Sequence, residues 1–122
     1  MGIDVLIVDD LTFIKMVLKD LVEKAGFRVV GEASDGEEAV RLYEEKKPDV
    51  VLLDITMPKM DGLAALKQIL KIDPAARVIM CSALGQQRLI LQAIQLGAKD
   101  FIVKPFRPER VIGSIKKILD IQ

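Results

Sequence analysis

Short apolar runs alternate along this chain with longer segments in which apolar residues recur every three or four positions. The short runs are typical of buried strands, and the longer segments are typical of amphipathic helices. The predicted strands cover residues 3–8, 27–33, 49–53, 78–81 and 101–103. The predicted helices cover about residues 13–25, 34–45, 61–71 and 86–96, and a last one begins at residue 108.

Residues that start and stop helices support these boundaries. Gly26 and Gly97 lie where the first and fourth helices should end, because glycine readily adopts the conformation that follows a helix. Ser34 and Glu37 have the spacing of a capping box and predict the start of the second helix. Pro108 is favoured at the first position of a helix, which places the start of the last one.

The alternation predicts an α/β fold with a parallel sheet. Uninterrupted apolar strands such as Val50–Leu53 indicate that both faces of the sheet are buried. Short connections and right-handed crossovers then give a three-layer, doubly wound (βα)5 arrangement. Neither a linker nor a shift in composition divides residues 1–122, so we expect one domain with no effector domain.

Polar residues suited to phosphoryl and metal chemistry follow four of the predicted strands. Asp9 and Asp10 follow the first strand, Asp54 the third, Ser82 the fourth and Lys104 the fifth. The carboxyl ends of parallel strands meet at one edge of an open sheet, where ligands bind. The sequence therefore predicts one acidic pocket that also holds a lysine and a hydroxyl group.

The two adjacent aspartates can be interpreted in two ways. One of them can cap the helix that follows. Three carboxylates in one pocket would repel one another, however, unless a cation lay between them. Mg²⁺ suits Asp9, Asp10 and Asp54 because it prefers oxygen ligands and accepts a mixed shell of protein, water and phosphate.

Asp54 is the candidate nucleophile, because a carboxylate at a rigid strand end can form an aspartyl phosphate. Lys104 would neutralise the phosphoryl oxygens, and Ser82 would donate a hydrogen bond to one of them. Alone, Ser82 would be interpreted as a cap or turn residue and Lys104 as a solvated side chain. Pro105 is either a plain turn residue or a cis proline, and Phe101 is either ordinary core or an aromatic switch.

Composition excludes several classes of function. The 122 residues carry 18 basic and 18 acidic side chains, so no nucleic-acid footprint is expected. The absence of histidine rules out imidazole metal sites and Ser-His or Cys-His nucleophile pairs. Cys81, the single cysteine, is expected to be a buried thiol. With no leader and no apolar run of membrane-spanning length, we expect a cytoplasmic protein.

The chain resembles the receiver domains of response regulators over essentially its whole length. The resemblance is carried by residues 6–10, 54–62, 81–83, 85–87 and 97–106, which include Asp54-Ile55-Thr56-Met57-Pro58-Lys59-Met60-Asp61-Gly62 and Lys104-Pro105-Phe106. It implies a flavodoxin-like sheet in the order 2-1-3-4-5. It also implies that the longer stretches are of the chemotaxis type.

The resemblance also implies a role for each residue of the pocket. Asp54 would be the phosphoacceptor. The ligands of Mg²⁺ would be Asp10, Asp54 and the backbone carbonyl of Thr56, with Asp9 acting largely through water. Ser82 and Lys104 would bind the phosphoryl group, Phe101 would be the conformational switch and Pro105 would support the turn.

The implied function is two-component signalling, in which a sensor histidine kinase phosphorylates the domain and an output protein such as the flagellar motor switch binds it. A phosphatase is a further expected partner, and a monomer is the expected state. Such a domain is not an enzyme beyond catalysing its own phosphorylation and dephosphorylation. Residues 86–119 are expected to form the face that binds the output protein. This chain departs from the family pattern at Leu11-Thr12, where two small residues would be expected. Thr56 and Leu84 occupy positions that resemble those at which the family tunes the lifetime of the phosphoryl group.

Three other classes of protein share part of this pattern. A haloacid-dehalogenase-type phosphatase needs a second aspartate where this chain has Thr56, and a flavodoxin-type carrier needs a loop rich in hydroxyl groups and glycine where it has Asp9–Thr12. A phosphorelay carrier, or another receiver outside chemotaxis, uses the same pocket and stays open.

Overall fold

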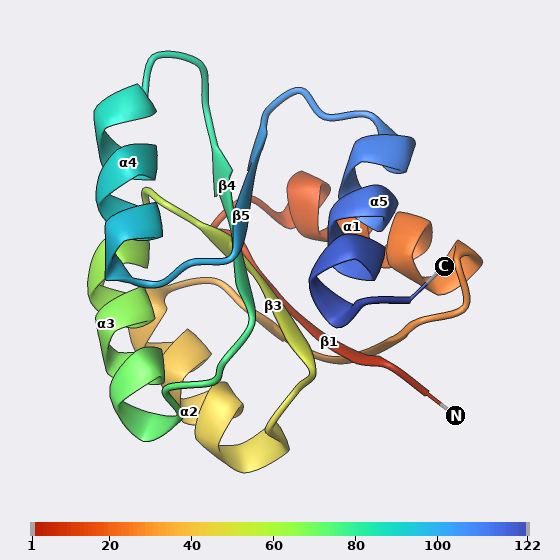
Figure 1. Ribbon diagram of the computed structural model, residues 1–122, viewed down its shortest axis with the longest axis horizontal. Helices are drawn as coiled ribbons and strands as arrows, with labels where there is room; N and C mark the ends of the chain where they lie inside the picture. The colour runs from red at the N-terminus through yellow and green to blue at the C-terminus, as the bar shows by residue number, and fades with distance from the viewer. Residues whose placement is uncertain (1, 122) are drawn as a thin grey trace.

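The computed structural model describes residues 2–121 as five parallel strands alternating with five helices (Figure 1). The strands are β1 (Asp4–Val8), β2 (Arg28–Ala33), β3 (Val50–Asp54), β4 (Val78–Ser82) and β5 (Asp100–Val103). The helices are α1 (Thr12–Lys24), α2 (Gly36–Lys46), α3 (Gly62–Ile72), α4 (Gln87–Leu96) and α5 (Pro108–Leu119). The strand order β2-β1-β3-β4-β5 confirms the expected doubly wound sheet.

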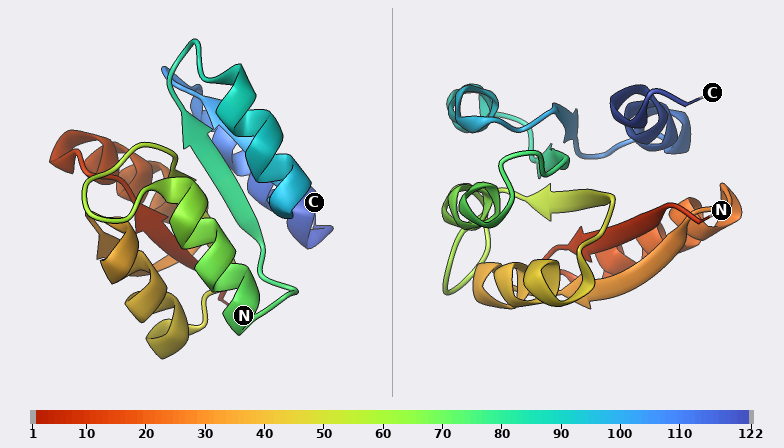
Figure 2. Two further views of the ribbon diagram at one scale, coloured as in Figure 1. Left: turned by 90° about the vertical axis from the view of Figure 1, so that its left-hand side faces the viewer. Right: turned by 60° about the horizontal axis from the view of Figure 1, so that its bottom comes forward.

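Helices cover both faces of the sheet, as the apolar strands predicted. Helices α1 and α5 lie on one face, and α2, α3 and α4 lie on the other (Figures 1 and 2). Along β1, Val5 and Ile7 belong to the core under α1 and α5, whereas Leu6 and Val8 belong to the core under the other three helices. This alternation follows from the two-residue period of a strand. None of the helices within residues 2–121 is long and apolar enough to cross a membrane.

The N-cap of α2 lies one residue later than predicted. Asp35 is the N-cap, and its carboxylate accepts a hydrogen bond from the Glu38 amide at 2.9 Å. Glu38 in turn accepts from the Ser34 amide at 2.8 Å. The expected pair, Ser34 and Glu37, has the same spacing, so two registers were open. The adopted register makes Gly36 the first helical residue, at a position where a Cβ would lie only 2.0 Å from the Met60 carbonyl oxygen.

Gly62 fixes the segment that follows the candidate nucleophile. A Cβ at this position would lie 2.1 Å from the carbonyl oxygen of Asp54, so only glycine allows the two backbones to approach. The Gly62 amide donates to the Ile55 carbonyl at 2.6 Å, and Asp61 caps α3 by accepting from the Ala64 amide at 2.9 Å. The end of β3 is therefore held in place by the segment that connects it to α3.

Candidate functional site

The polar residues predicted to converge lie at the carboxyl edge of the sheet, the upper edge in Figure 1. Asp9 directly follows β1, Asp54 and Ser82 end β3 and β4, and Lys104 directly follows β5. One carboxylate oxygen from each of Asp9, Asp10 and Asp54 lies within 4.8 Å of the others. The convergence expected from the strand ends is thus present.

The donor set of this cluster fits Mg²⁺. Three carboxylates offer hard oxygen ligands, and Mg²⁺ is commonly held by only one or two of them together with water and phosphate oxygens. Asp9 is fully buried and Asp54 is 6% exposed, whereas Asp10 is open to solvent. The cluster thus consists of two buried carboxylates and one that is accessible to solvent.

Lys104 bridges the two buried carboxylates. Its Nζ lies 2.7 Å from Asp9 Oδ2 and 3.3 Å from Asp54 Oδ1. Burial alone would lower the pKa of the ammonium group, but the two carboxylates outweigh burial and raise the pKa of Lys104. The lysine therefore stays charged inside the pocket. The other oxygen of Asp9 accepts from the Leu11 amide at 2.9 Å, so Asp9 also orders the turn into α1.

The carboxylate of Asp54 is electrostatically strained in this arrangement. Burial, and then the negative charge of Asp9, raise the pKa of Asp54 from 3.8 to about 6, although Lys104 opposes both effects. Its ionised form is therefore short of compensating positive charge. A cation beside the cluster would supply that charge.

Ser82 has a buried hydroxyl group that lacks a partner. Its side chain is fully buried, and Ser82 Oγ is the single buried polar side-chain atom within residues 2–121 that makes no hydrogen bond. The backbone of Ser82 is held, because its carbonyl accepts from the Lys104 amide at 2.7 Å. An unpaired buried hydroxyl is costly, so this group is available for a new acceptor.

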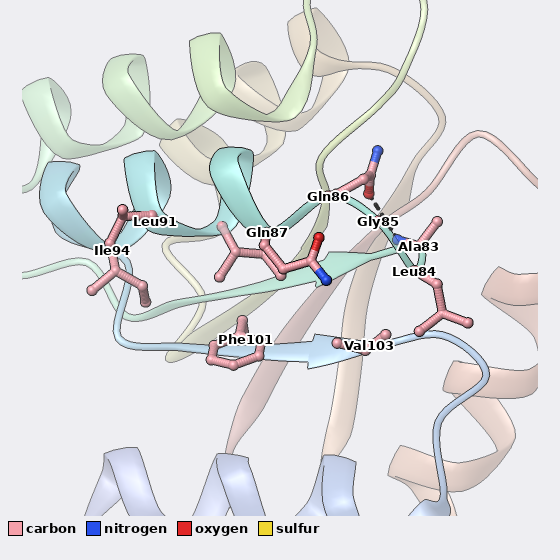
Figure 3. Close-up of a pocket in the computed structure, with 10 residues that line it drawn as sticks. Ala83, Leu84, Gly85, Gln86, Gln87, Leu91, Ile94, Phe101 and Val103 are labelled. Carbon is pink, nitrogen blue, oxygen red and sulfur yellow. Dashed lines mark hydrogen bonds between the residues drawn. The ribbon is translucent and has the colours of Figure 1, made fainter.

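Phe101 lies at the surface rather than in the core. The residue is 37% exposed, and it borders an apolar hollow of about 360 Å³ between α4 and β5 (Figure 3). Leu84 and Leu91, also at the edge of this hollow, are 78% and 59% exposed. The alternative of ordinary core is wrong for Phe101, and the switch role remains a prediction.

A cluster centred on Asp100, next to Phe101, was missed from the sequence. The Asp100 carboxylate accepts from Ser114 Oγ at 2.6 Å and pairs with Arg110 at 3.3 Å and Lys117 at 3.1 Å. Burial alone would raise the pKa of Asp100, but these hydrogen bonds outweigh it and lower the pKa well below its ordinary value. The cluster fastens α5 to β5. An aspartate directly before the apolar run Phe101–Val103 is the sequence signal that could have revealed it.

Two further residues of the sequence analysis have defined environments. Cys81 is buried, as expected, and burial raises the pKa of its thiol to about 12, so it is not a nucleophile. The peptide bond between Lys104 and Pro105 is cis, one of the two forms left open.

Gln86 was also missed, and it links two loops at the mouth of the pocket. Its Oε1 accepts from the Ala83 amide at 2.7 Å (Figure 3), and its Nε2 donates to Thr56 Oγ1 at 2.8 Å. Thr56 is the second residue after Asp54, and Ala83 directly follows Ser82. No sequence signal marks this contact, because a glutamine before a helix is ordinary and Thr56 is 30 residues away.

This edge, with its acidic cluster and its lysine on a doubly wound sheet, is that of a signalling receiver rather than of a flavin carrier. The response regulator receiver domain family matches residues 5–116, and the chain belongs to that family. It is similar to the chemotaxis protein CheY of Thermotoga maritima, with 58% identity over 97% of this chain and 98% of that protein. It is also 57% identical to CheY of Bacillus subtilis, over 95% of this chain and 97% of that protein.

A solved relative supports the same assignment. The CheY chain in the crystal structure of the CheX-CheY-BeF3-Mg²⁺ complex from Borrelia burgdorferi matches with a TM-score of 0.92 and 44% identity. The match covers 96% of this chain and 89% of that one. The chain is therefore a two-component response-regulator receiver domain, closely similar to CheY.

Proposed function

We propose that this receiver accepts a phosphoryl group on Asp54 from a CheA-like sensor histidine kinase and then binds an output protein of the chemotaxis system. The observation that carries the proposal is the carboxylate of Asp54, 6% exposed and held between a second buried carboxylate and Lys104. Receivers lack an activity on a separate substrate, and here the only reaction is at the domain's own aspartate.

The transfer forms one bond and breaks another. A carboxylate oxygen of Asp54 attacks the phosphorus atom, and the bond from phosphorus to the imidazole nitrogen of the donor breaks, leaving the electron pair on that nitrogen. Asp54 must be ionised to attack. Gly62 keeps the end of β3 in place, because the Gly62 backbone lies directly against the Asp54 carbonyl. Lys104, already within 3.3 Å of the acceptor carboxylate, can follow the charge onto the phosphoryl oxygens.

Mg²⁺ is the cofactor that we propose for the acidic cluster. The carboxylates of Asp10 and Asp54 and the backbone carbonyl of Thr56 would be its direct ligands, and Asp9 would act through water. When bound, the ion would neutralise charge on the phosphoryl oxygens. Asp9 keeps its ion pair with Lys104, which holds the lysine in the pocket until the phosphoryl group competes for it.

The readout would pass through Ser82 and Phe101. The unpaired hydroxyl of Ser82 would donate to a phosphoryl oxygen, and the loop after β4 would move with it. The Phe101 ring would then turn into the hollow beneath α4 and repack the face formed by α4, β5 and α5 (Figure 3). Pro105 would support the turn that aims Lys104.

We infer that the repacked face binds a flagellar motor switch protein or another output protein. The identity with two CheY proteins supports a chemotaxis role. The Borrelia structure, in which CheX is in complex with CheY, supports a CheX-type partner, and a phosphatase is a further partner that we propose. The domain would work as a cytoplasmic monomer.

Intact-mass analysis with acetyl phosphate and Mg²⁺ tests the proposal. The wild type should gain one acid-stable, base-labile phosphoryl group, and Asp54→Asn should gain none because an amide is a poor nucleophile. Asp61→Asn is the matched control, since Asp61 caps α3 outside the cluster. Undiminished labelling of Asp54→Asn would reject Asp54 as the acceptor.

A further inference from the structure

Gln86 ties together the two loops that must rearrange around a phosphoryl group. The loop after β3 carries Thr56, and the loop after β4 carries Ala83. The single carboxamide of Gln86 is the acceptor for one and the donor for the other, at 2.7 and 2.8 Å. Both distances are those of well-formed hydrogen bonds.

The Ala83 amide lies at the edge of the sheet that carries the acceptor, where a phosphoryl group would need hydrogen-bond donors. Asp54 pairs in register with Cys81, and the Ile55 amide donates to the Cys81 carbonyl at 3.1 Å. Ala83 is therefore the first residue after β4, two positions beyond the residue that pairs in register with the acceptor. A backbone N–H at such a position can donate to an anionic oxygen. In this structure that N–H is already used by Gln86.

The loop that contains Ala83 has few other restraints. Leu84 is 78% exposed, and Gly85 adopts a φ of +90° that favours glycine. The buried hydroxyl of Ser82, one residue before Ala83, has no partner. The hydrogen bond from the Ala83 amide to the Gln86 side chain is thus a main restraint on this loop, and it can be broken reversibly.

We propose that Gln86 is a positioning residue that holds the loop after β4 in its unphosphorylated arrangement by occupying the amide of Ala83. The proposal rests on the proposed function, since the competitor is a phosphoryl group on Asp54. A charged oxygen is a stronger acceptor than a carboxamide, so it displaces Gln86. Release of Gln86 also frees Thr56 and lets Ser82 approach the acceptor. The side chain thereby opposes activation until phosphorylation occurs.

The probe for this proposal is beryllofluoride, a phosphoryl mimic, titrated with saturating Mg²⁺ and followed by amide chemical shifts. Gln86→Ala should bind it about threefold to tenfold more tightly than wild type, the range that one net hydrogen bond represents. The Ala83 amide resonance should move in the same variant before any beryllofluoride is added.

Two further variants separate this role from a structural one. Gln68→Ala is the matched control, because Gln68 is an exposed glutamine of α3, outside the output face, and its side chain makes no hydrogen bond within residues 2–121. Gln86→Ser replaces the N-cap of α4, where glutamine makes no capping bond, with a good capping residue that is too short to reach Thr56. Gln86→Ser should therefore bind beryllofluoride more tightly than wild type without loss of thermal stability, and Gln68→Ala should behave as wild type.

The outcomes distinguish this inference from the proposed function. If wild type fails to bind beryllofluoride, the proposed function fails. If wild type binds it and both Gln86 variants have the same or weaker affinity, only the role of Gln86 is overturned. A Thr56→Val background adds a direct test, since the effect of Gln86→Ala should shrink when the second hydrogen bond is already absent.

Discussion

Lys104 and Asp9 form the tightest ion pair of the site, with 2.7 Å between Nζ and Oδ2 and a separation of 95 positions in the chain. Asp9 is fully buried and the Lys104 side chain is 19% exposed. A buried ion pair contributes little net stability over an apolar pair, but removing one partner leaves an uncompensated buried charge. This ion pair therefore stabilises the fold and also holds Lys104 in the pocket, beside the acceptor carboxylate.

Lys104→Met should lower the free energy of unfolding by roughly 2–4 kcal/mol, because the Asp9 carboxylate loses its counter-charge. Urea denaturation in metal-free buffer measures this change. Lys99→Met is the control, since Lys99 is exposed, and it should have an effect of less than about 0.5 kcal/mol. Asp9→Asn in the Lys104→Met background should restore part of the loss. Equal stability of the two lysine variants would show that Lys104 does not stabilise the buried carboxylate.

Asp10→Asn should weaken Mg²⁺ binding by roughly tenfold or more, as losing a direct ligand costs no less than losing an outer partner. Calorimetric titration with Mg²⁺ measures the affinity. The fold should be unaffected or slightly stabilised, because Asp10 is exposed and its removal relieves repulsion within the cluster.

Asp20→Asn provides the same change of charge on the exposed surface of α1, where Asp20 pairs with Lys24 at 3.1 Å. It should leave the affinity for Mg²⁺ unchanged. If Asp10→Asn binds Mg²⁺ as tightly as this control, the acidic cluster is not the metal site.

The ends of the strands were predictable, and the contacts between loops were not. Asp54 and Lys104 could be placed together because parallel strands bring their carboxyl ends to one edge whatever the loops do. Gln86 and Thr56 meet only because two irregular loops happen to pass each other, and neither residue type has a preference that predicts it. Phe101 begins an apolar run that is typical of a buried strand. However, β5 is an edge strand, and the hollow beneath α4 leaves Phe101 accessible to solvent.

The raised pKa of Asp54 predicts a pH-dependent stability in the absence of metal. Because the folded-state value is about 6 and the ordinary value is 3.8, the folded protein holds this proton more tightly than the unfolded chain does. The contribution of Asp54 to stability is therefore present below about pH 4 and is lost as the pH rises through 6. Asp54→Asn removes this dependence.

The gain in free energy of unfolding from Asp54→Asn should thus be larger at pH 7 than at pH 4, by about 2–3 kcal/mol for a shift of about two pKa units. Urea denaturation of both proteins with EDTA at the two pH values measures the difference. A gain that is the same at both would mean that Asp54 is not a strained carboxylate.

Ser82→Ala should separate phosphorylation from its readout. Ser82 Oγ makes no hydrogen bond within residues 2–121, so its removal should leave the free energy of unfolding unchanged or raise it by up to about 1 kcal/mol. Ser114→Ala is the matched control, a buried serine that donates to Asp100 at 2.6 Å, and it should lose about 1–2 kcal/mol. Urea denaturation compares the two.

The same Ser82→Ala variant should still be labelled at Asp54 by acetyl phosphate, since the nucleophile and Lys104 remain in place. Its response to beryllofluoride should be confined to the pocket, because the loop after β4 no longer has a hydroxyl group with which to follow the phosphoryl oxygens. Amide chemical shifts around Phe101 and along α5 should therefore change much less than in wild type. A ligand moves such an equilibrium only by its differential affinity for the two states, so a residual shift is expected. Remote changes as large as those of wild type would show that Ser82 does not couple the acceptor to the output face.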